Sequence, residues 1–458
     1  MIKRILAAVM CLGIFLTVSC AEAPELLNFL PEATDANNFD GREIRLSWSS
    51  YTSAADYAID TPQYDAYIKR LSDAEKNFNC NIITGEELGE INLSLDVMAG
   101  AYCVDIVLGS HMDLAEDKLM YPLNGFDGLL DPYEEKFGGL RYLEMGMVNG
   151  IPYIVTPTMW PGFEPKGFVL AYNRTMFNEY GLTDLHEYYE NEIWTYDTFE
   201  NEFIAKTYIQ DRNGDLIIDF GTDGTDYYQC LMFSNDVHFV KVASDGSLIA
   251  DPNSQAFRNA LEWGQNLFKN YGDRLEGDME THDQPEYRNQ KMLVTTAYGA
   301  QITTGNIAYN DIATFETGVM PFPCGPDAEY GIWRQYTDPY GFSIPITADS
   351  PESAAMIIDY VSEPFEEFGG DAGLFDYYAS NIFSTELDAK IFIEASQEPY
   401  VNYIGRGDRE MNAIREGIGD ITVNPNLSLN EAITKYQSIL TEAIEKYMIP
   451  NYKAVYGE

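Results

Sequence analysis

Hydrophobic and polar positions alternate in EIRLSW (43–48) with the period of two that predicts a half-buried strand. The apolar runs CNIIT (80–84) and VDIVLG (104–109) predict two more strands, with a helix between them. A further helix fits the segment after Pro62, where apolar side chains recur at three-to-four spacing: Tyr64, Tyr67, Ile68, Leu71 and Phe78. Strand, helix, strand, helix, strand predicts a parallel sheet covered by helices on both faces.

The middle of the chain repeats this alternation after an irregular break. GIPYIV (150–155) is strand-like, TPTMWPGFEPKG (156–167) carries three prolines, and FVLAYN (168–173) is again a strand. The prolines predict a crossing between two lobes. A short helix ends at Gly181, where a left-handed residue stops a helix at low cost. A second helix begins near Trp194 and is expected to place three aromatic side chains on one face: Phe199, Phe203 and Tyr208.

The chain after residue 250 contains the remaining elements. Residues 251–272 form a long amphipathic helix, KMLVTTAYG (291–299) forms a strand, and GVMPFP (318–323) forms a second crossing. Ser350 is expected to cap a helix that has Pro351 at its first position. Ser428 and Glu431 form a capping box for a last helix whose inward residues are Ile433, Tyr436, Leu440 and Tyr447.

The chain begins with a short apolar run. Lys3 and Arg4 precede about fourteen mostly apolar residues, which suits a signal peptide better than a membrane-spanning helix, since the latter needs about twenty. Thr17-Val18-Ser19-Cys20 resembles a bacterial lipobox, although Thr17 replaces the usual leucine. We expect residues 1–19 to be a signal peptide, Cys20 to carry lipid, and 20–42 to be a tether. An ordinary secretory signal is the alternative.

Charge and cysteine content narrow the partners. Without residues 1–19 the chain has 458 − 19 = 439 residues and a formal charge of −45 − 2 = −47, which argues against nucleic acid as a partner. No second apolar run approaches membrane-spanning length. Cys80, Cys103, Cys230 and Cys324 show no CxxC spacing. A bridge between Cys80 and Cys103 stays open, although the two are too far apart if their strands flank a third.

Several segments resemble, in the right order, the family 1 extracellular solute-binding proteins of ABC importers, the maltose-binding-protein-like sugar binders. VLAYNRTMFNEYGL resembles the family's strand, Tyr-Asn, short helix and glycine, and NGIPYIVTP resembles its first crossing. WTYDTF resembles a helix start, and VMPFP followed by GFSIPITADSPESAAMIIDYV resembles the return crossing and the next helix. VDIVLGSHMDLAEDKLMYPLNGF resembles the third strand and the turn that follows its helix.

This resemblance implies an α/β protein with the two-lobed type II periplasmic-binding fold, each lobe a central mixed sheet flanked by helices. Lobe 1 would comprise 43–157 plus 322–362, and lobe 2 would comprise 158–321 plus 363–458. Ligand would lie between the lobes, at loops that follow the carboxyl ends of strands, and the lobes would close on it by hinge motion.

The first candidate ligand residues follow the ends of predicted strands. Trp48 and Tyr51 follow the first strand, and Ser110 and His111 follow the third, where the family places cleft contacts. A tryptophan ring could cover the C–H face of a sugar, and the histidine could bind hydroxyl groups. For Trp48 and His111, a purely structural role is the alternative.

The other candidates belong to the crossings and to the second lobe. Trp160 lies in the irregular first crossing, an unusual place for a buried ring, and Glu164 could accept hydroxyl hydrogen bonds or be an ordinary surface residue. The strand KMLVTTAYG ends at a position where the family often presents an aromatic ring, and the last two candidates lie just past the return crossing. These four residues are Tyr298, Gln301, Trp333 and Tyr336.

The loop QDRNGDLIIDFGTD has the oxygen rhythm of a calcium loop. The five expected ligands are Asp211, Asn213, Asp215, the Ile217 carbonyl and Asp219. However, Leu216 replaces the glycine of the sixth position, and Thr222 replaces the bidentate glutamate unless Asp223 substitutes for it. A structural Ca²⁺ therefore stays open, and no other cofactor is expected.

We expect a receptor and not an enzyme: a monomer, exported and held at the outer face of a membrane by its lipid, that delivers a carbohydrate to ABC permease subunits. The sequence contains no GxSxG, HExxH, P-loop or GxGxxG motif. The alternatives are a secreted carbohydrate-active enzyme with a carboxylate pair, and a sensor or adhesin with the same fold.

Overall fold

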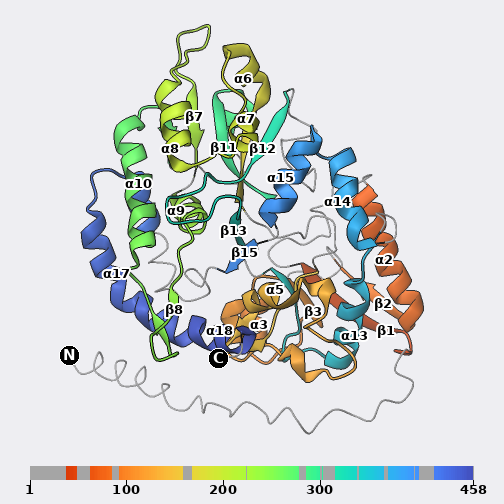
Figure 1. Ribbon diagram of the computed structural model, residues 1–458. Helices are drawn as coiled ribbons and strands as arrows, with labels where there is room; N and C mark the ends of the chain where they lie inside the picture. The colour runs from red at the N-terminus through yellow and green to blue at the C-terminus, as the bar shows by residue number, and fades with distance from the viewer. Residues whose placement is uncertain are drawn as a thin grey trace, which may run out of the picture. The chain divides into compact units, whose positions relative to one another are not determined.

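The computed structural model describes residues 38–48, 62–84, 92–157, 168–222, 224–277, 285–299, 302, 315–337, 340–365, 370–396, 398–401 and 417–456. These residues form two larger sheets, which we call sheet A and sheet B, three two-stranded sheets, and helices that cover them (Figure 1). The small sheets pair β4 (Met147–Val148) with β5 (Ile151–Pro152), β8 (Val240–Val242) with β9 (Leu248–Ala250), and β13 (Arg334–Thr337) with β15 (Glu398–Val401).

Sheet A has four strands in the order β14-β3-β1-β2. Its strands are β1 (Arg42–Trp48), β2 (Cys80–Ile83), β3 (Ile106–Gly109) and β14 (Gly341–Ser343). β1 runs parallel to β2 and β3, whereas β14 runs antiparallel to β3. The predicted alternation is confirmed, because Ile44 and Leu46 are buried while Glu43 is exposed.

Helices cover both faces of sheet A, as predicted. The core that contains Ile44 and Leu46 also contains side chains from α2 (Pro62–Phe78) and α13 (Pro351–Val361). Val107 of β3 packs instead with Val97 of α3 (Leu93–Met98). α4 (Met112–Glu116) and α5 (Gly139–Met145) complete this part. Because β1 lies between β2 and β3, Cys80 and Cys103 are separated, and both are free thiols.

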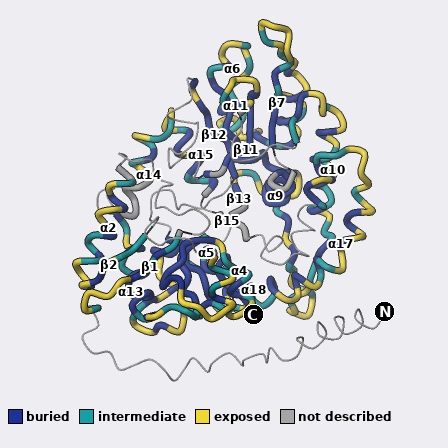
Figure 2. Tube along the Cα trace, turned by 180° about the vertical axis from the view of Figure 1, so that it is seen from behind, coloured by how far each residue is buried: buried dark blue, intermediate teal, exposed yellow. Residues whose placement is uncertain are grey.

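Sheet B has five strands in the order β10-β7-β11-β6-β12. Its strands are β6 (Phe168–Asn173), β7 (Ile218–Gly221), β10 (Leu275–Glu276), β11 (Met292–Tyr298) and β12 (Thr317–Met320). β11 runs parallel to β7 and antiparallel to β6, and β12 also runs antiparallel to β6. β11 and β12 carry the dark blue of buried residues in Figure 2, and all six residues of β6, FVLAYN, are buried as well.

The helices around sheet B are α6 (Arg174–Tyr180), α7 (Leu185–Glu190), α8 (Tyr196–Thr198), α9 (Gly224–Ser234), α10 (Gln255–Tyr271), α11 (Pro285–Arg288) and α15 (Glu386–Ser396). Gly181 ends α6 with a φ of 67°, as predicted. After α8 the helix continues as the π-helical segment Phe199–Phe203 and one 3₁₀ turn, Ile204–Lys206. The prediction for Tyr208 was wrong: the helix ends before it, and its side chain is 65% exposed.

The C-terminal helices are divided between the two cores. α14 (Gly370–Asn381) contributes Tyr378 to the core of sheet A, and the following Phe383 packs against both cores. α17 (Leu429–Ala443) begins at the Ser428 cap and packs on sheet B, whereas Val455 of α18 (Ile449–Tyr456) lies in the core of sheet A. The range 363–458, which we expected in lobe 2, therefore does not pack on sheet B alone.

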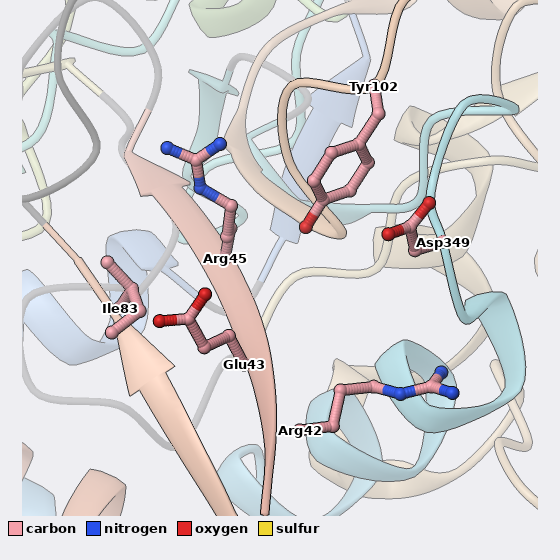
Figure 3. A pocket seen from close by; sticks show the side chains of 6 residues that line it. All are labelled: Arg42, Glu43, Arg45, Ile83, Tyr102 and Asp349. Atoms are coloured by element: carbon pink, nitrogen blue, oxygen red, sulfur yellow. The ribbon is translucent and has the colours of Figure 1, made fainter.

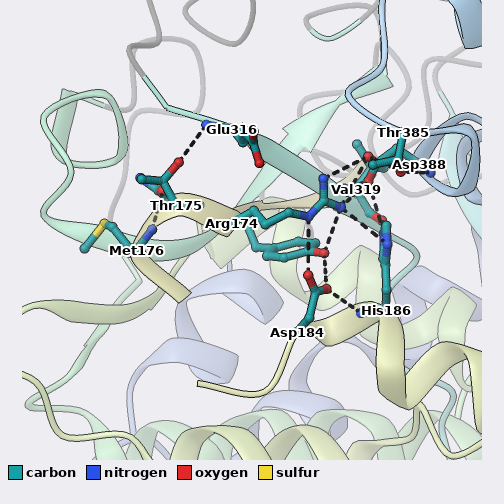
Figure 4. Close-up of polar contacts among 11 residues, drawn as sticks. Arg174, Thr175, Met176, Asp184, His186, Glu316, Val319, Thr385 and Asp388 are labelled. Atoms are coloured by element: carbon teal, nitrogen blue, oxygen red, sulfur yellow. Dashed lines mark hydrogen bonds and ion pairs between the residues drawn. The ribbon is translucent and has the colours of Figure 1, made fainter. Parts of the chain in front are cut away.

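A buried polar cluster fixes the outer strand of sheet B (Figure 4). The carboxylate of Asp388 on α15 accepts hydrogen bonds from the Val319 backbone N–H of β12 at 2.8 Å and from Arg174 at 3.0 Å. Arg174 also donates to Nδ1 of His186, which leaves the proton of a neutral His186 ring on Nε2, within 3.2 Å of the Val319 carbonyl oxygen. Both backbone groups of Val319 are thus satisfied, which caps an otherwise open strand edge.

Candidate functional site

The strands of sheet A end together at one edge. Trp48 at the end of β1 lies beside Leu108 of β3, and Gly109 lies opposite Gly341 at the start of β14. Ser110 and His111 follow directly from β3. The carboxyl ends of parallel strands are where open α/β sheets generally bind ligands. The structure therefore brings three of the predicted residues to one edge.

His111 has the most distinctive environment of these candidates. It occupies the cap position of α4 but makes no capping hydrogen bond, and its Nε2 atom is enclosed without a hydrogen-bond partner in the described part of the chain. Burial lowers the pKa of the imidazole, with Asp113 opposing the shift, so the ring is neutral at neutral pH. A buried nitrogen without a partner costs about 1–3 kcal/mol, which a ligand hydroxyl could recover.

Two chain segments connect the sheets and run side by side where they meet sheet A. Val155 and Phe342 exchange backbone hydrogen bonds of 3.0 and 2.8 Å, and the Thr156 hydroxyl donates to the Tyr340 carbonyl at 2.9 Å. Gly341 is required here, because a Cβ atom at this position would lie 2.1 Å from the Val155 oxygen. The two segments are thus joined to each other beside the edge that carries His111.

The same two segments meet sheet B at one of its edges. The first enters at Phe168, which pairs with Tyr298 at the end of β11, and the second leaves after Met320, which pairs with Leu170. Trp194 fixes the start of the second segment by donating from Nε1 to the Pro321 carbonyl at 2.9 Å. The predicted residue Tyr298 therefore stands at the edge of sheet B from which both connections run to sheet A.

The remaining candidates are a buried tryptophan, a residue of another sheet, and residues outside the described part of the chain. Trp333 is only 5% exposed, with its ring 5.8 Å from that of Tyr189 and 5.3 Å from that of Tyr330, so it would have to be uncovered to stack on a ligand. The backbone of Tyr336 pairs with that of Tyr400. The candidates outside the described residues are Cys20, Tyr51, Trp160, Glu164 and Gln301.

The calcium interpretation does not fit the structure. The Asp211 carboxylate accepts hydrogen bonds from the backbone N–H groups of Asn213 and Asp215, which closes the turn without a cation. Asp219 lies on β7, 2.9 Å from the Arg274 guanidinium, and burial raises the pKa of its carboxyl group to about 7 although Arg274 opposes the shift. Because Asp219 pairs with Arg274, it does not complete a cation site with the other expected ligands, Asn213, Asp215 and Ile217. Among the described residues, no three His, Cys, Asp or Glu side chains could hold a metal ion.

A separate hollow of about 590 Å³ lies on sheet A near the start of β1 (Figure 3). Buried Asp105 organises its wall: it accepts hydrogen bonds from the Arg45 backbone at 2.9 Å, the Tyr102 hydroxyl at 2.9 Å and the Asp349 backbone at 3.1 Å. Our selection of residues after strand ends missed this hollow. Its sequence signal was the pair of charged side chains, Glu43 and Arg45, on the outward positions of the first strand. The residues around it are Arg42, Glu43, Arg45, Ile83, Tyr102 and Asp349.

The fold has known counterparts among solved structures. An ABC substrate-binding protein from Listeria monocytogenes in complex with cycloalternan is 14% identical, with a TM-score of 0.59 over 89% of this chain and 100% of that one. The GacH receptor of Streptomyces glaucescens, solved unliganded and with acarbose, is 14% identical, with a TM-score of 0.58 over 89% and 99%. This chain has the fold of the ABC solute-binding proteins.

A third counterpart binds a different kind of molecule. UgpB from Mycobacterium tuberculosis, solved with glycerophosphocholine, is 15% identical, with a TM-score of 0.57 over 87% of this chain and 98% of that one. No family model matches the sequence, and no curated protein matches it.

The likeness to these solved structures confirms the predicted mixed α/β, two-lobed fold class. Within the described ranges, no helix combines the length and the apolar character needed to cross a bilayer.

Proposed function

We propose that this protein is a lipid-anchored extracellular receptor that captures a carbohydrate between two lobes and delivers it to an ABC permease. The observation that carries the proposal is the pair of strand-end edges, one on each sheet, from which the two connecting segments run. Solved proteins that share the fold include complexes with cycloalternan and acarbose, which supports a carbohydrate as ligand. Lobe 1 would be built on sheet A, and lobe 2 on sheet B.

The chemistry at the two edges suits a sugar. A sugar offers hydroxyl groups, which the unpartnered Nε2 of His111 could bind, and a C–H face, which an aromatic ring could cover. Trp48 and Tyr298 stand at strand ends on the two sheets, and Trp160 belongs to the first connecting segment. Together they would supply stacking from both lobes, while Glu164 would accept hydroxyl hydrogen bonds.

Capture would follow from lobe closure. Ligand bound to one lobe favours the closed state only by the extra contacts that it makes with the other lobe. The permease would then distinguish the closed receptor from the open one. No chemical change of the ligand is required at any step.

A thermal-shift screen over oligosaccharides tests the ligand class. A glycan that binds, at a hundredfold excess over its dissociation constant, should add about 2.7 kcal/mol of stability. His111→Ala and Trp160→Ala should each remove most of this gain. The matched control is His238→Ala, because that ring is 53% exposed and lies elsewhere, between α9 and β8. Stabilisation by glycerophosphocholine and by no glycan would refute the carbohydrate, and turnover of the glycan would favour the enzyme.

The anchor has its own test. With the natural leader, the protein should sediment with membranes and incorporate labelled palmitate, because several acyl chains hold a protein where one does not. Cys20→Ala should abolish the label and release the protein into the soluble fraction. Cys11→Ala is the control, because that residue lies inside the expected signal peptide. Release of the parent protein without label would indicate an ordinary secretory signal.

A further inference from the structure

The C-terminal helix runs without interruption from 429 to 456 but changes its geometry in the middle. α17 (Leu429–Ala443) is followed by the π-helical segment η9 (Ile444–Met448) and then by α18 (Ile449–Tyr456). Figure 1 shows α17 passing the lower end of α10 and continuing into α18. A π-helical turn within an α-helix is rare and is a recognised point of bending.

The sequence explains the position of this turn. Pro450 lacks a backbone N–H, so it cannot bond the carbonyl of Lys446 four residues earlier, and its ring would clash with that carbonyl in a regular helix. The wider turn immediately before Pro450 relieves the clash. The helix is therefore weakest between 444 and 449, where a hydrogen bond is missing.

The part of the helix before this turn is fixed to sheet B. Its buried side chains belong to the core around β6, β7, β11 and β12. They come from every turn of α17: Ala432, Ile433, Tyr436, Leu440 and Ala443. The buried side chains of η9, Ile444, Tyr447 and Met448, lie in the same core, so α17 and η9 must move together with sheet B.

The part after the turn is fixed to the sheet A side. The fully buried side chain of Asn451 closes on the turn between β4 and β5, accepting from the Gly150 N–H at 2.7 Å and donating to the Met147 carbonyl at 2.9 Å. Gly150 has a φ of +77°, and a Cβ atom there would lie 2.8 Å from that of Ala454. Val455 enters the core of sheet A. From Asn451 onward, α18 must therefore move with sheet A.

We propose that this helix is a strap between the lobes, which bends where η9 meets α18, at Ile449 and Pro450, and uses Asn451 as its anchor on lobe 1. It would limit how far the lobes open, and Asn451 would act as a positioning residue for ligand capture without touching the ligand. This inference rests on the hinge motion of the proposed function. Because η9 and α18 are held by different cores, any rotation between the sheets has to be absorbed where these two segments meet, beside Pro450.

The distance distribution between two spin labels tests the strap without any ligand. The labels would replace Lys76 on α2, beside sheet A, and Lys269 on α10, beside sheet B, in a chain whose Cys11 and Cys20 are changed to alanine. The four other cysteines are buried. Pro450→Ala permits a regular, stiffer helix and should narrow the distribution without lowering the melting temperature. Asn451→Ala releases the anchor and should broaden it.

A second proline supplies the control. Pro351 occupies the first turn of α13, where no helical hydrogen bond is lost, so Pro351→Ala should leave the distribution unchanged. If Pro450→Ala gives the distribution of Pro351→Ala, the bend is not at this turn and the strap is refuted. It is also refuted if Asn451→Ala only lowers the melting temperature. A protein that binds no glycan in the thermal-shift screen is a separate outcome. If Pro450→Ala then still narrows the distance distribution and Asn451→Ala still broadens it, the strap is upheld and the carbohydrate receptor is refuted.

Discussion

Replacing Asp388 by alanine should lower the free energy of unfolding by about 3–5 kcal/mol, because it removes the buried carboxylate nearest to the Arg174 guanidinium and leaves only Asp184, a partly exposed acid at 3.4 Å, as its countercharge. Asp388 is fully buried and also holds the Val319 N–H and the Thr385 hydroxyl. Chemical denaturation measures the loss. Glu386→Ala is the matched control, an exposed acid on the same helix, with an expected change within about 0.5 kcal/mol. Equal effects of the two substitutions would contradict the structure of the cluster.

The same cluster predicts a dependence on pH. Burial raises the pKa of Asp388, but hydrogen bonds from His186 and Arg174 outweigh it, so the folded-state pKa lies below its ordinary value, about 3.9. An acid with a lowered pKa contributes stability above its unfolded-state pKa and loses it as the pH falls through the folded-state value. The advantage of the parent over Asp388→Asn should therefore be constant above about pH 5 and shrink below about pH 4. An advantage that grows in acid would contradict this.

Replacing Trp194 by alanine should cost about 3–5 kcal/mol through the cavity it leaves, with a further loss from the Pro321 carbonyl. The ring is fully buried, 6.2 Å from the ring of Tyr188 and 5.7 Å from that of Phe199. Thermal unfolding measures the change.

Trp194→Phe separates the two contributions. It keeps most of the apolar contact, leaves a much smaller cavity and loses the hydrogen bond, so it should cost clearly less than alanine. Trp263→Ala is a second comparison, because this ring is only partly buried although it stacks on Tyr196 at 3.8 Å. A cost at Trp194 no larger than that at Trp263 would mean that the Pro321 segment is not held by this ring.

Local patterns predicted most of the elements, because each is determined by a few neighbouring residues. The alternation of 43–48 placed β1, Gly181 ended α6, and Ser428 caps α17 through the Glu431 N–H at 3.3 Å. Ser350 is a partial exception: it precedes α13 as expected, but its hydroxyl donates to Ser353 and caps no backbone group.

The candidate site could be predicted only where it follows strand ends. The register that brings Trp48, Gly109 and Gly341 to one edge supports that reasoning. Contacts between distant residues carry no local signal: Arg174 and Asp388 are 214 positions apart. For the same reason the spacing of acids could not show that Asp219 pairs with Arg274 and not with a cation. The lobe ranges and the ligand contacts stay predictions.

β14 comes much later in the sequence than its partner β3, and this affects how the chain reaches its native state. β3 needs this strand on its outer side, yet Gly341 follows Gly109 only after all of sheet B has been synthesised. Until then Ile106–Gly109, which is buried throughout in the finished protein, presents an unpaired and apolar backbone to other chains. Sheet A therefore cannot be completed early in biosynthesis. Because pairing between distant segments is generally slow, we expect folding to be slow and the unfinished chain to be prone to aggregation.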